Sequence, residues 1–295
     1  MKKWIALLAA AVLLLGLTAC KKQEVESDRI AKIKEAGVLV VGTSADYPPY
    51  EFHIDENGED KIVGFDMALS RRFAEELGVE LKIVDMPFDG LLISLDEGMF
   101  DFVMAGLTPR ADRAEFVDFT DIFFVNKQVT IIRKADADKY KTTADFKGVP
   151  IGVQRNTVQE EIAADLTGEE NVIKLVKFPD LIIELSNGKI EAICCNIMTA
   201  ASYVSGNDDL MVNDCGIVYE NTGFAGAVKK GDAELLAFLN EMIVKVKEDG
   251  SLDRYVEEAA AQSGAAKLLE DEEEETGEGE AEGAEGEAEL ETVSG

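Results

Sequence analysis

Basic residues are scarce in this chain of 295 residues: Lys and Arg number 29 against 59 Asp and Glu, so the formal net charge is -30 at pH 7. The segment Glu270–Glu291 holds 13 of the acids and no base, and without it the remainder still carries -17. Nucleic acids and anionic lipid surfaces both require basic protein surface, and no basic stripe is present. The composition therefore excludes a nucleic-acid partner and adsorption to a charged membrane.

Histidine and cysteine are also rare. The only histidine, His53, stands beside a probable hairpin, where a solvated side chain is expected, so it offers no obvious general acid or base. A zinc site would need further histidines or a second cysteine pair. Cys194 and Cys195 lie in a strand-like run, and Cys215 is the third cysteine after the N-terminal region. An odd number leaves at least one thiol without a partner in the chain, and we expect small buried apolar side chains, with no metal and no cofactor.

Long apolar runs are absent too. The longest, Ile5–Leu17, is too short for a comfortable membrane span but suits the core of a signal peptide, and Lys2 and Lys3 precede it. It ends in Leu17-Thr18-Ala19-Cys20, which looks like a bacterial lipobox. We therefore expect a lipoprotein signal peptide over residues 1–19, a fatty-acyl anchor such as palmitate on Cys20, and a tether over 20–36. The protein would be exported and held on the outer face of the cell membrane; an ordinary secretory signal is the alternative.

Two segments with a similar order of strands and helices follow. The length of the chain also suggests about two domains. In the first, Phe65, Leu69, Phe73 and Leu77 recur every four residues before Gly78, which indicates an amphipathic helix with a glycine cap, and Asn57-Gly58 indicates a hairpin turn. The order of elements is that of an α/β fold with a parallel-rich sheet. Further expected strands are Val38–Val41, Gln128–Ile132, Val149–Gln154, Val172–Phe178, Ile190–Asn196, Ile217–Tyr219 and Phe224–Val228; further expected helices are Leu181–Leu185, Met198–Val204, Asp232–Lys247 and Leu252–Ala261.

The stretch Asp101–Asp121 carries the clearest sign of a binding site. A short apolar strand ends at Gly106, and Thr108 stands directly before Pro109, as a helix N-cap stands before a first-turn proline. A helix start favours an anion, and Arg113 could grip a carboxylate with its planar fork. The pattern predicts a small-carboxylate clamp; the alternative is a simple cap and a surface arginine. A similar helix start is predicted where Thr157 and Glu160 form a capping box after a strand.

The final residues, 263–295, are predicted to be a disordered acidic tail, because Glu, Gly and Ala dominate from Leu268 onward and too little apolar surface remains to fold. A weak divalent-cation or cell-envelope role for this tail is the alternative.

A series of motifs between Gly37 and Val256 supports a more specific interpretation. They are Gly42-Thr43-Ser44-Ala45-Asp46-Tyr47-Pro48-Pro49-Tyr50-Glu51-Phe52, Gly64-Phe65-Asp66, Phe88-Asp89-Gly90-Leu91, Phe100-Asp101, Ala105-Gly106-Leu107-Thr108, Arg113, Val117-Asp118-Phe119-Thr120-Asp121, Gly152-Val153-Gln154 with Thr157, Asn187-Gly188-Lys189 and Val228-Lys229-Lys230-Gly231-Asp232. In this order they resemble the extracellular solute-binding proteins, family 3, the substrate-binding lipoproteins of polar amino-acid ABC importers.

The resemblance implies a two-lobed α/β fold of the periplasmic-binding-protein type II class, with two crossover strands and the ligand between the lobes. Residues 37–125 plus 227–262 would form lobe 1, and residues 126–226 would form lobe 2. Family positions that bind ligand fall here on Tyr47 and Phe88 around the apolar part of the solute, on Thr108 and Arg113 at its α-carboxylate, on the backbone of Ala105 and Gly106, and on Thr157 from lobe 2. Ser44 and Phe52 are further possible contacts.

Two positions depart from the family pattern. Asn196 stands where an aspartate usually pairs with the ligand ammonium, so the charge-assisted part of that contact is lost. Arg110 stands where a small hydroxyl residue is common, and it could contact a second acidic group of the ligand or point to solvent. We expect a monomeric binding protein without enzymatic activity, which delivers a small amino acid to an ABC permease and its ATPase. The alternatives are a non-amino-acid carboxylate ligand, a dehydratase-like enzyme on the same fold, and a ligand sensor.

Overall fold

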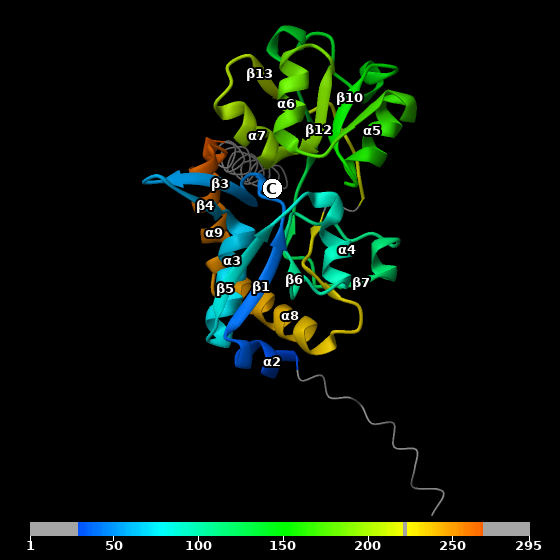
Figure 1. Ribbon diagram of the computed structural model, residues 1–295. Coiled ribbons are helices and arrows are strands. Elements are labelled where there is room, and N and C mark those ends of the chain that lie inside the picture. Colours follow the sequence, from blue (N-terminus) through cyan, green and yellow to red (C-terminus); the bar gives the residue numbers. More distant parts are fainter. Residues whose placement is uncertain (1–28, 221–222, 268–295) are drawn as a thin grey trace, which may run out of the picture.

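The computed structural model describes residues 29–220 and 223–267, and the chain forms two α/β lobes stacked one on the other (Figure 1). The predicted signal peptide, the lipidation site Cys20 and residues 268–295 of the predicted tail lie outside the described residues. Within the described part of the chain, no helix is long and apolar enough to cross a membrane.

Lobe 1 is built on a five-stranded sheet in the order β5-β1-β6-β15-β7. Its strands are β1 (Val38–Thr43), β5 (Glu80–Asp85), β6 (Phe102–Val103), β7 (Val117–Phe119) and β15 (Ala227–Lys229). β1 pairs in parallel with β5 and β6, while β15 runs antiparallel to β6 and β7. Because β15 comes from near the end of the chain, lobe 1 is assembled from two distant segments.

Five helices cover the sheet of lobe 1. They are α2 (Arg29–Ala36), α3 (Phe65–Leu77), α4 (Leu91–Asp96), α8 (Ala233–Glu248) and α9 (Ser251–Ser263), with short 3-10 turns η1 (Phe88–Gly90) and η2 (Arg113–Glu115). α3 ends at Gly78 in the left-handed conformation, as its sequence predicts. β2 (Asp46–Tyr47), β3 (Glu51–Glu56) and β4 (Glu59–Val63) form a separate sheet whose hairpin turns at Asn57 and Gly58, both with positive φ.

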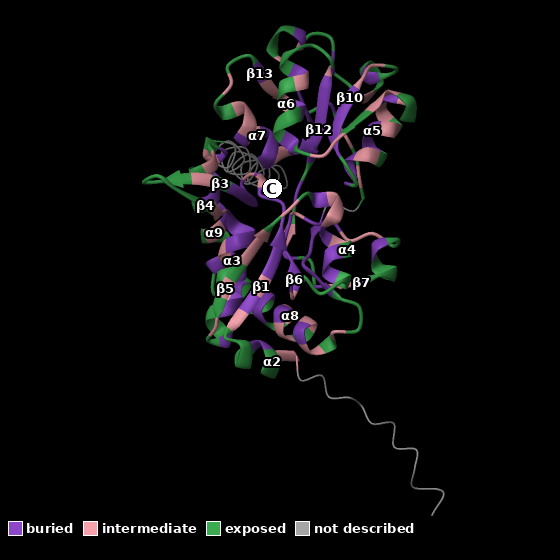
Figure 2. Ribbon diagram, viewed as in Figure 1, coloured by how far each residue is buried: buried purple, intermediate pink, exposed green. Residues whose placement is uncertain are grey.

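Lobe 2 repeats the plan with a sheet in the order β11-β10-β12-β9-β13. Its strands are β9 (Gln128–Arg133), β10 (Ile151–Gln154), β11 (Val172–Leu175), β12 (Ala192–Asn196) and β13 (Leu210–Asn213). The helices are α5 (Gln159–Thr167), α6 (Phe178–Ser186) and α7 (Ile197–Ser205), and the 3-10 turns are η3 (Lys134–Asp136), η4 (Thr143–Phe146) and η5 (Glu169–Asn171). In both lobes the sheet strands and the inner helix faces are buried (Figure 2).

Two short strands carry the chain between the lobes. β8 (Phe124–Val125) and β14 (Gly223–Phe224) pair antiparallel, one leading out of lobe 1 and the other leading back. They are the two crossover strands that the resemblance implies, and they set the hinge beside which the ligand cleft must lie. The predicted two-lobed α/β fold is therefore confirmed.

Two local predictions are wrong. The expected tether over 20–36 includes α2, whose residue Ile33 is buried and whose first residue, Arg29, pairs with Asp101 at 2.5 Å. With eight residues, α2 is too short to be stable as an isolated helix, so its contacts with the rest of lobe 1 stabilise it. Ile217–Tyr219 forms no strand.

The prediction for the cysteines after the N-terminal region holds. Cys194, Cys195 and Cys215 are free thiols, and all three are buried. Cys194 and Cys195 are interior positions of β12, where they pack as small apolar side chains.

Candidate ligand-binding site

A cavity lies between the two lobes and is lined by side chains of both. Every main predicted contact lines it, and so does Ser44, whereas the possible contacts Phe52 and Arg110 do not. Glu51, Gln154, Val158 and Gln159 also line it although the sequence analysis did not assign them to the site. The full lining is Ser44, Tyr47, Glu51, Phe88, Ala105, Gly106, Thr108 and Arg113 from lobe 1, and Gln154, Thr157, Val158, Gln159 and Asn196 from lobe 2.

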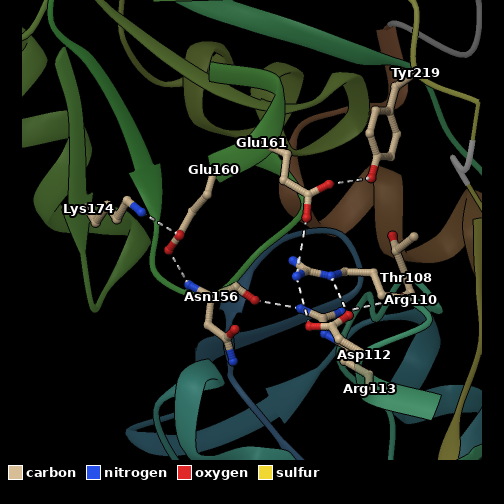
Figure 3. A network of polar contacts seen from close by, with 9 residues as sticks. All are labelled: Thr108, Arg110, Asp112, Arg113, Asn156, Glu160, Glu161, Lys174 and Tyr219. Atoms are coloured by element: carbon tan, nitrogen blue, oxygen red, sulfur yellow. Dashed lines mark hydrogen bonds and ion pairs between the residues drawn. The ribbon is translucent and has the colours of Figure 1, made fainter. Parts of the chain in front are cut away.

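Arg113 is the cationic group of this cavity. Its side chain leaves η2, is 6% exposed, and lies over the ring of Phe88 with 5.6 Å between the guanidinium carbon and the ring centroid. One terminal nitrogen donates to the carbonyl of Thr108 at 2.8 Å, and the other donates across the cleft to the carbonyl of Asn156 at 2.5 Å (Figure 3). The Nε has no hydrogen-bond partner in the part of the chain that the structure describes. Burial, assisted by the nearby charge of Arg110, lowers the Arg113 pKa to about 10.

The segment before Arg113 differs from the prediction. Thr108 does not cap an α-helix, because the chain continues as a loop and forms only the 3-10 turn η2. Of the residues between Pro109 and the start of β7 at Val117, only Arg113–Glu115 form a helical turn. The anion-binding helix start predicted here is therefore wrong, and the buried guanidinium of Arg113 carries the positive charge instead.

Thr157 lies at the start of α5, near the expected position but without the predicted capping box. Its hydroxyl donates to the carbonyl of Gln154 at 2.7 Å. The carboxylate of Glu160 accepts the backbone N–H of Asn156 at 2.6 Å, one residue earlier than the box requires, and Asn156 itself has φ 63°. Thr157 nevertheless lines the cavity opposite Arg113, on the lobe 2 side.

A buried chain of amides crosses the cleft behind the cavity. The hydroxyl of Tyr47 accepts the side-chain amide of Asn196 at 3.0 Å and its backbone N–H at 3.2 Å. The amide oxygen of Asn196 accepts from Gln128 at 2.7 Å, and Gln128 in turn accepts from Gln159 at 2.9 Å. Asn196, predicted as a weak acceptor for the ligand ammonium, is therefore already hydrogen-bonded on both sides.

Further contacts join the lobes around the cavity. The carboxylate of Asp46, in lobe 1, accepts the backbone N–H of Phe178 at the start of α6 at 3.0 Å and the side-chain amide of Gln154 at 3.1 Å. The hydroxyl of Tyr203 donates to the Asp46 carbonyl at 2.8 Å, and Arg155 meets Asp89 at 3.4 Å. The structure is thus that of two lobes in contact across their cleft.

Arg110 belongs to the mouth of the cleft rather than to its interior. Asp112 holds its guanidinium through two hydrogen bonds of 3.0 and 2.9 Å, and Glu161 of α5 pairs with it at 3.2 Å across the mouth (Figure 3). Tyr219 supports Glu161 through a weak hydrogen bond of 3.4 Å. Arg110 is placed to join the lobes, which is a role that the sequence analysis did not anticipate.

The described residues contain no cluster of His, Cys, Asp or Glu that could hold a metal ion. His53 lies on the hairpin, away from the cavity, between the exposed carboxylates of Asp60 at 2.9 Å and Asp85 at 3.4 Å. Glu51 is the one carboxyl group among the residues that line the cavity.

Comparison with known proteins identifies the family. The sequence profile of the bacterial extracellular solute-binding proteins, family 3, matches residues 39–260. The chain belongs to this family. Among curated family members, the arginine-binding extracellular protein ArtP of Bacillus subtilis is 32% identical over 259 residues, which are 86% of this chain and 96% of that protein. The L-cystine-binding protein TcyJ of Escherichia coli is 29% identical, over 84% of this chain and 91% of its own length.

Solved structures of similar proteins share the two-lobed fold. The amino acid ABC transporter substrate-binding protein AbpA of Streptococcus pneumoniae, bound to L-arginine, has a TM-score of 0.76 at 32% identity, covering 79% of this chain and 98% of its own. The ancestral amino acid-binding protein AncCDT-1, described as a precursor of cyclohexadienyl dehydratase, has a TM-score of 0.71 at 31% identity, covering 78% and 98%. The comparisons thus place the chain among amino-acid ABC transporter substrate-binding proteins.

Proposed function

We propose that this protein is the lipid-anchored substrate-binding component of an ABC importer, and that it captures one amino acid between its lobes and delivers it to the permease. The observation that carries the proposal is Arg113, a buried cation whose Nε has no hydrogen-bond partner among the described residues and which lines the cavity between the lobes. A buried cation without a counter-charge is unfavourable, and a ligand carboxylate supplies that charge.

In this proposal Arg113 and Thr108 hold the α-carboxylate from lobe 1, and Thr157 approaches it from lobe 2. The rings of Tyr47 and Phe88 flank the apolar part of the ligand, and the backbone at Ala105 and Gly106 supplies further polar contacts, with Asn196 nearby. The ligand therefore touches both lobes, and it shifts the population toward the closed form.

The first test is binding by the mature chain after bound ligand has been removed by partial unfolding. A thermal shift against the standard amino acids, simple dicarboxylates and cystine identifies the ligand, because a binder at about 100 times its Kd adds about 2.7 kcal/mol of stability. The matched amine that lacks the α-carboxylate should give no shift. If the amine binds as well as the amino acid, Arg113 does not hold a carboxylate; if only dicarboxylates without an amine bind, the amino-acid assignment is wrong.

Two further experiments test the lipid anchor and the absence of catalysis. A mass measurement of the N-terminal peptide from bacterial membranes should show acyl chains on Cys20, and Cys20→Ala should release the protein from the membrane. We propose no catalysis, although AncCDT-1 warrants a check. Prolonged incubation with the bound ligand, followed by NMR, should show it unchanged; a new product would favour an enzyme.

A further inference from the structure

The end of helix α9 forms a contact between the lobes that is separate from the crossover strands. α9 packs on α3 and α8 within lobe 1, yet its last turn also lies against α7 of lobe 2 (Figure 1). There the hydroxyl oxygens of Ser202 and Ser263 lie 2.9 Å apart, within hydrogen-bond distance. Side chains therefore join the two lobes at this point, in addition to the backbone of β8 and β14.

Gly264, which ends α9, allows this close approach. It has φ +86°, in the left-handed region, and its N–H donates to the carbonyl of Ala260. A Cβ at this position would lie 2.9 Å from the Cβ of Ser205 in α7 and still closer to its Oγ. That Oγ donates to the Ser202 carbonyl at 3.0 Å, and the residue after the glycine, Ala265, is 0% exposed. A side chain at position 264 would therefore push α7 and α9 apart.

Helix α7 connects this contact to the ligand cavity. Asn196 directly precedes its first residue, lines the cavity and donates to the hydroxyl of Tyr47 in lobe 1 at 3.0 Å. Near the other end of the helix, Tyr203 donates to the carbonyl of Asp46, also in lobe 1, at 2.8 Å. Nine helical residues span about 13 Å and move as one body. A displacement at Ser205 therefore also moves the lobe 2 wall of the cavity.

We propose that Gly264 is a positioning residue for ligand capture: the end of α9 positions α7 when the lobes close, and α7 places lobe 2 against the ligand. The inference rests on the proposed function, because the lobes close on a ligand. It goes further in giving a role to a residue outside the site, since none of the described residues that line the cavity belongs to α9. A side chain at position 264 should weaken binding without touching the ligand.

Gly264→Ala tests the proposal, and Gly78→Ala is the matched control. Gly78 ends α3 in the same left-handed conformation, and the N–H of the next residue, Val79, donates to the Ala74 carbonyl at 3.0 Å. A Cβ there would meet no atom of the described residues within 4 Å. Both variants carry the backbone strain of a left-handed alanine, but only Gly264→Ala meets lobe 2.

We expect the two variants to have ligand-free melting temperatures within about 2 °C of each other. The Kd should rise about tenfold or more in Gly264→Ala, as one or two weakened hydrogen bonds across the cleft would cause, and stay within about threefold of the parent in Gly78→Ala. Equal Kd values in the two variants would overturn the inference, because strain at a helix end would then account for any change.

Substitution of the facing serine should rescue the affinity of Gly264→Ala. Ser205→Gly removes both atoms that the new methyl group meets, whereas Ser205→Ala removes the Oγ and leaves the Cβ. Added to Gly264→Ala, Ser205→Gly should return the Kd to within about threefold of the parent, and Ser205→Ala should give an intermediate value. Failure of Ser205→Gly to restore affinity would show that the methyl group does not act through α7.

Isothermal titration of the mature chain uses L-arginine as the first probe, because AbpA is bound to it, and the other standard amino acids next. Spin labels at the exposed positions Lys82→Cys in lobe 1 and Lys189→Cys in lobe 2 report the distance between the lobes. At saturating ligand this distance should be longer in Gly264→Ala than in Gly78→Ala, and equal distances would overturn the inference while leaving the amino-acid function standing. Absence of binding by every amino acid would instead refute the proposed function. The ligand-free distances, longer only in Gly264→Ala, would then decide whether α9 positions α7.

Discussion

Replacing Arg113 by methionine should separate binding from folding. The side chain is 6% exposed, and burial is the main reason why its pKa falls more than two units below the usual arginine value, to about 10. At 1.36 kcal/mol per unit, the protein holds this cation at a cost of about 3 kcal/mol relative to water when no anion is present. A ligand carboxylate offsets that cost. Loss of one partner of a buried charge pair weakens binding by about 3–5 kcal/mol, which is roughly 10²- to 10³-fold or more in Kd.

The same substitution should leave the ligand-free protein nearly as stable as the parent. The lost hydrogen bonds to Thr108 and Asn156 destabilise it, while removal of the desolvated cation stabilises it by a similar amount. Calorimetry should therefore show a Kd at least 100-fold higher with a melting temperature within about 3 °C. Arg155→Met is the control, because that arginine also faces the other lobe but its side chain is 51% exposed, and its Kd should change less than threefold. Parent-like affinity in Arg113→Met, or unfolding of the ligand-free variant, would refute this reasoning.

Three further predictions concern the mouth of the cleft, the buried thiols of lobe 2 and the glycine that precedes α3. A double-mutant cycle of Arg110→Met and Glu161→Gln should give a coupling of about 0.5–1 kcal/mol in ligand affinity, equal for all ligands and smaller at high salt; a change in ligand preference would instead place Arg110 on the ligand. The three lobe 2 thiols, which burial keeps protonated by raising their pKa values, should resist iodoacetamide until the protein is unfolded, and fast alkylation of the native protein would contradict their burial. Gly64→Ala should destabilise the protein by about 3 kcal/mol and lower the melting temperature by roughly 6–12 °C, since φ is +117° and a Cβ would lie 2.1 Å from the carbonyl oxygen of Tyr50; an unchanged melting curve would show that the backbone can shift.

Elements with strong local signals were predictable from the sequence. The four-residue apolar spacing of α3 and the glycine after it specify the helix and its end without help from the rest of the chain. Asn57-Gly58 likewise specifies the hairpin, because both residues tolerate the positive φ that a two-residue turn needs. For these elements local preference and the packed fold agree.

Elements that depend on distant residues were not predictable. The local pattern Thr108-Pro109 favours a helix, but the chain there forms a loop and the short turn η2, and Arg113 folds back onto the Thr108 carbonyl. Helix α2 is the opposite case. Its polar sequence predicts an unstructured tether, but contacts with residues far along the chain, such as Asp101, stabilise a helix. In both cases tertiary structure overrides a local preference.

The residues of the binding site likewise include some that were predictable from the sequence and some that were not. Thr108, Arg113 and Thr157 all line the cavity, although the helix start from which Thr108 and Arg113 were predicted is absent. Glu51 stands in the motif that carries the resemblance, yet nothing in the sequence shows that its carboxyl group is fully buried beside that of Asp66. This burial results from packing β3 against α3, and only the folded structure reveals it.

The unpaired Nε of Arg113 also opposes closure of the empty cavity. With the lobes together, this atom has no hydrogen-bond partner among the described residues, whereas opening of the cleft would let water reach it. The contacts at Asp46 and Arg110 favour closure, so the empty protein balances these contacts against the unpaired donor, and a ligand carboxylate that accepts from Arg113 shifts the balance to the closed form. Arg113→Met should therefore raise the closed fraction of the ligand-free protein. Distance measurements between labels on the two lobes would show a shorter mean distance in the variant than in the parent, and a longer distance would mean that the hydrogen bond from Arg113 to the Asn156 carbonyl holds the empty lobes together.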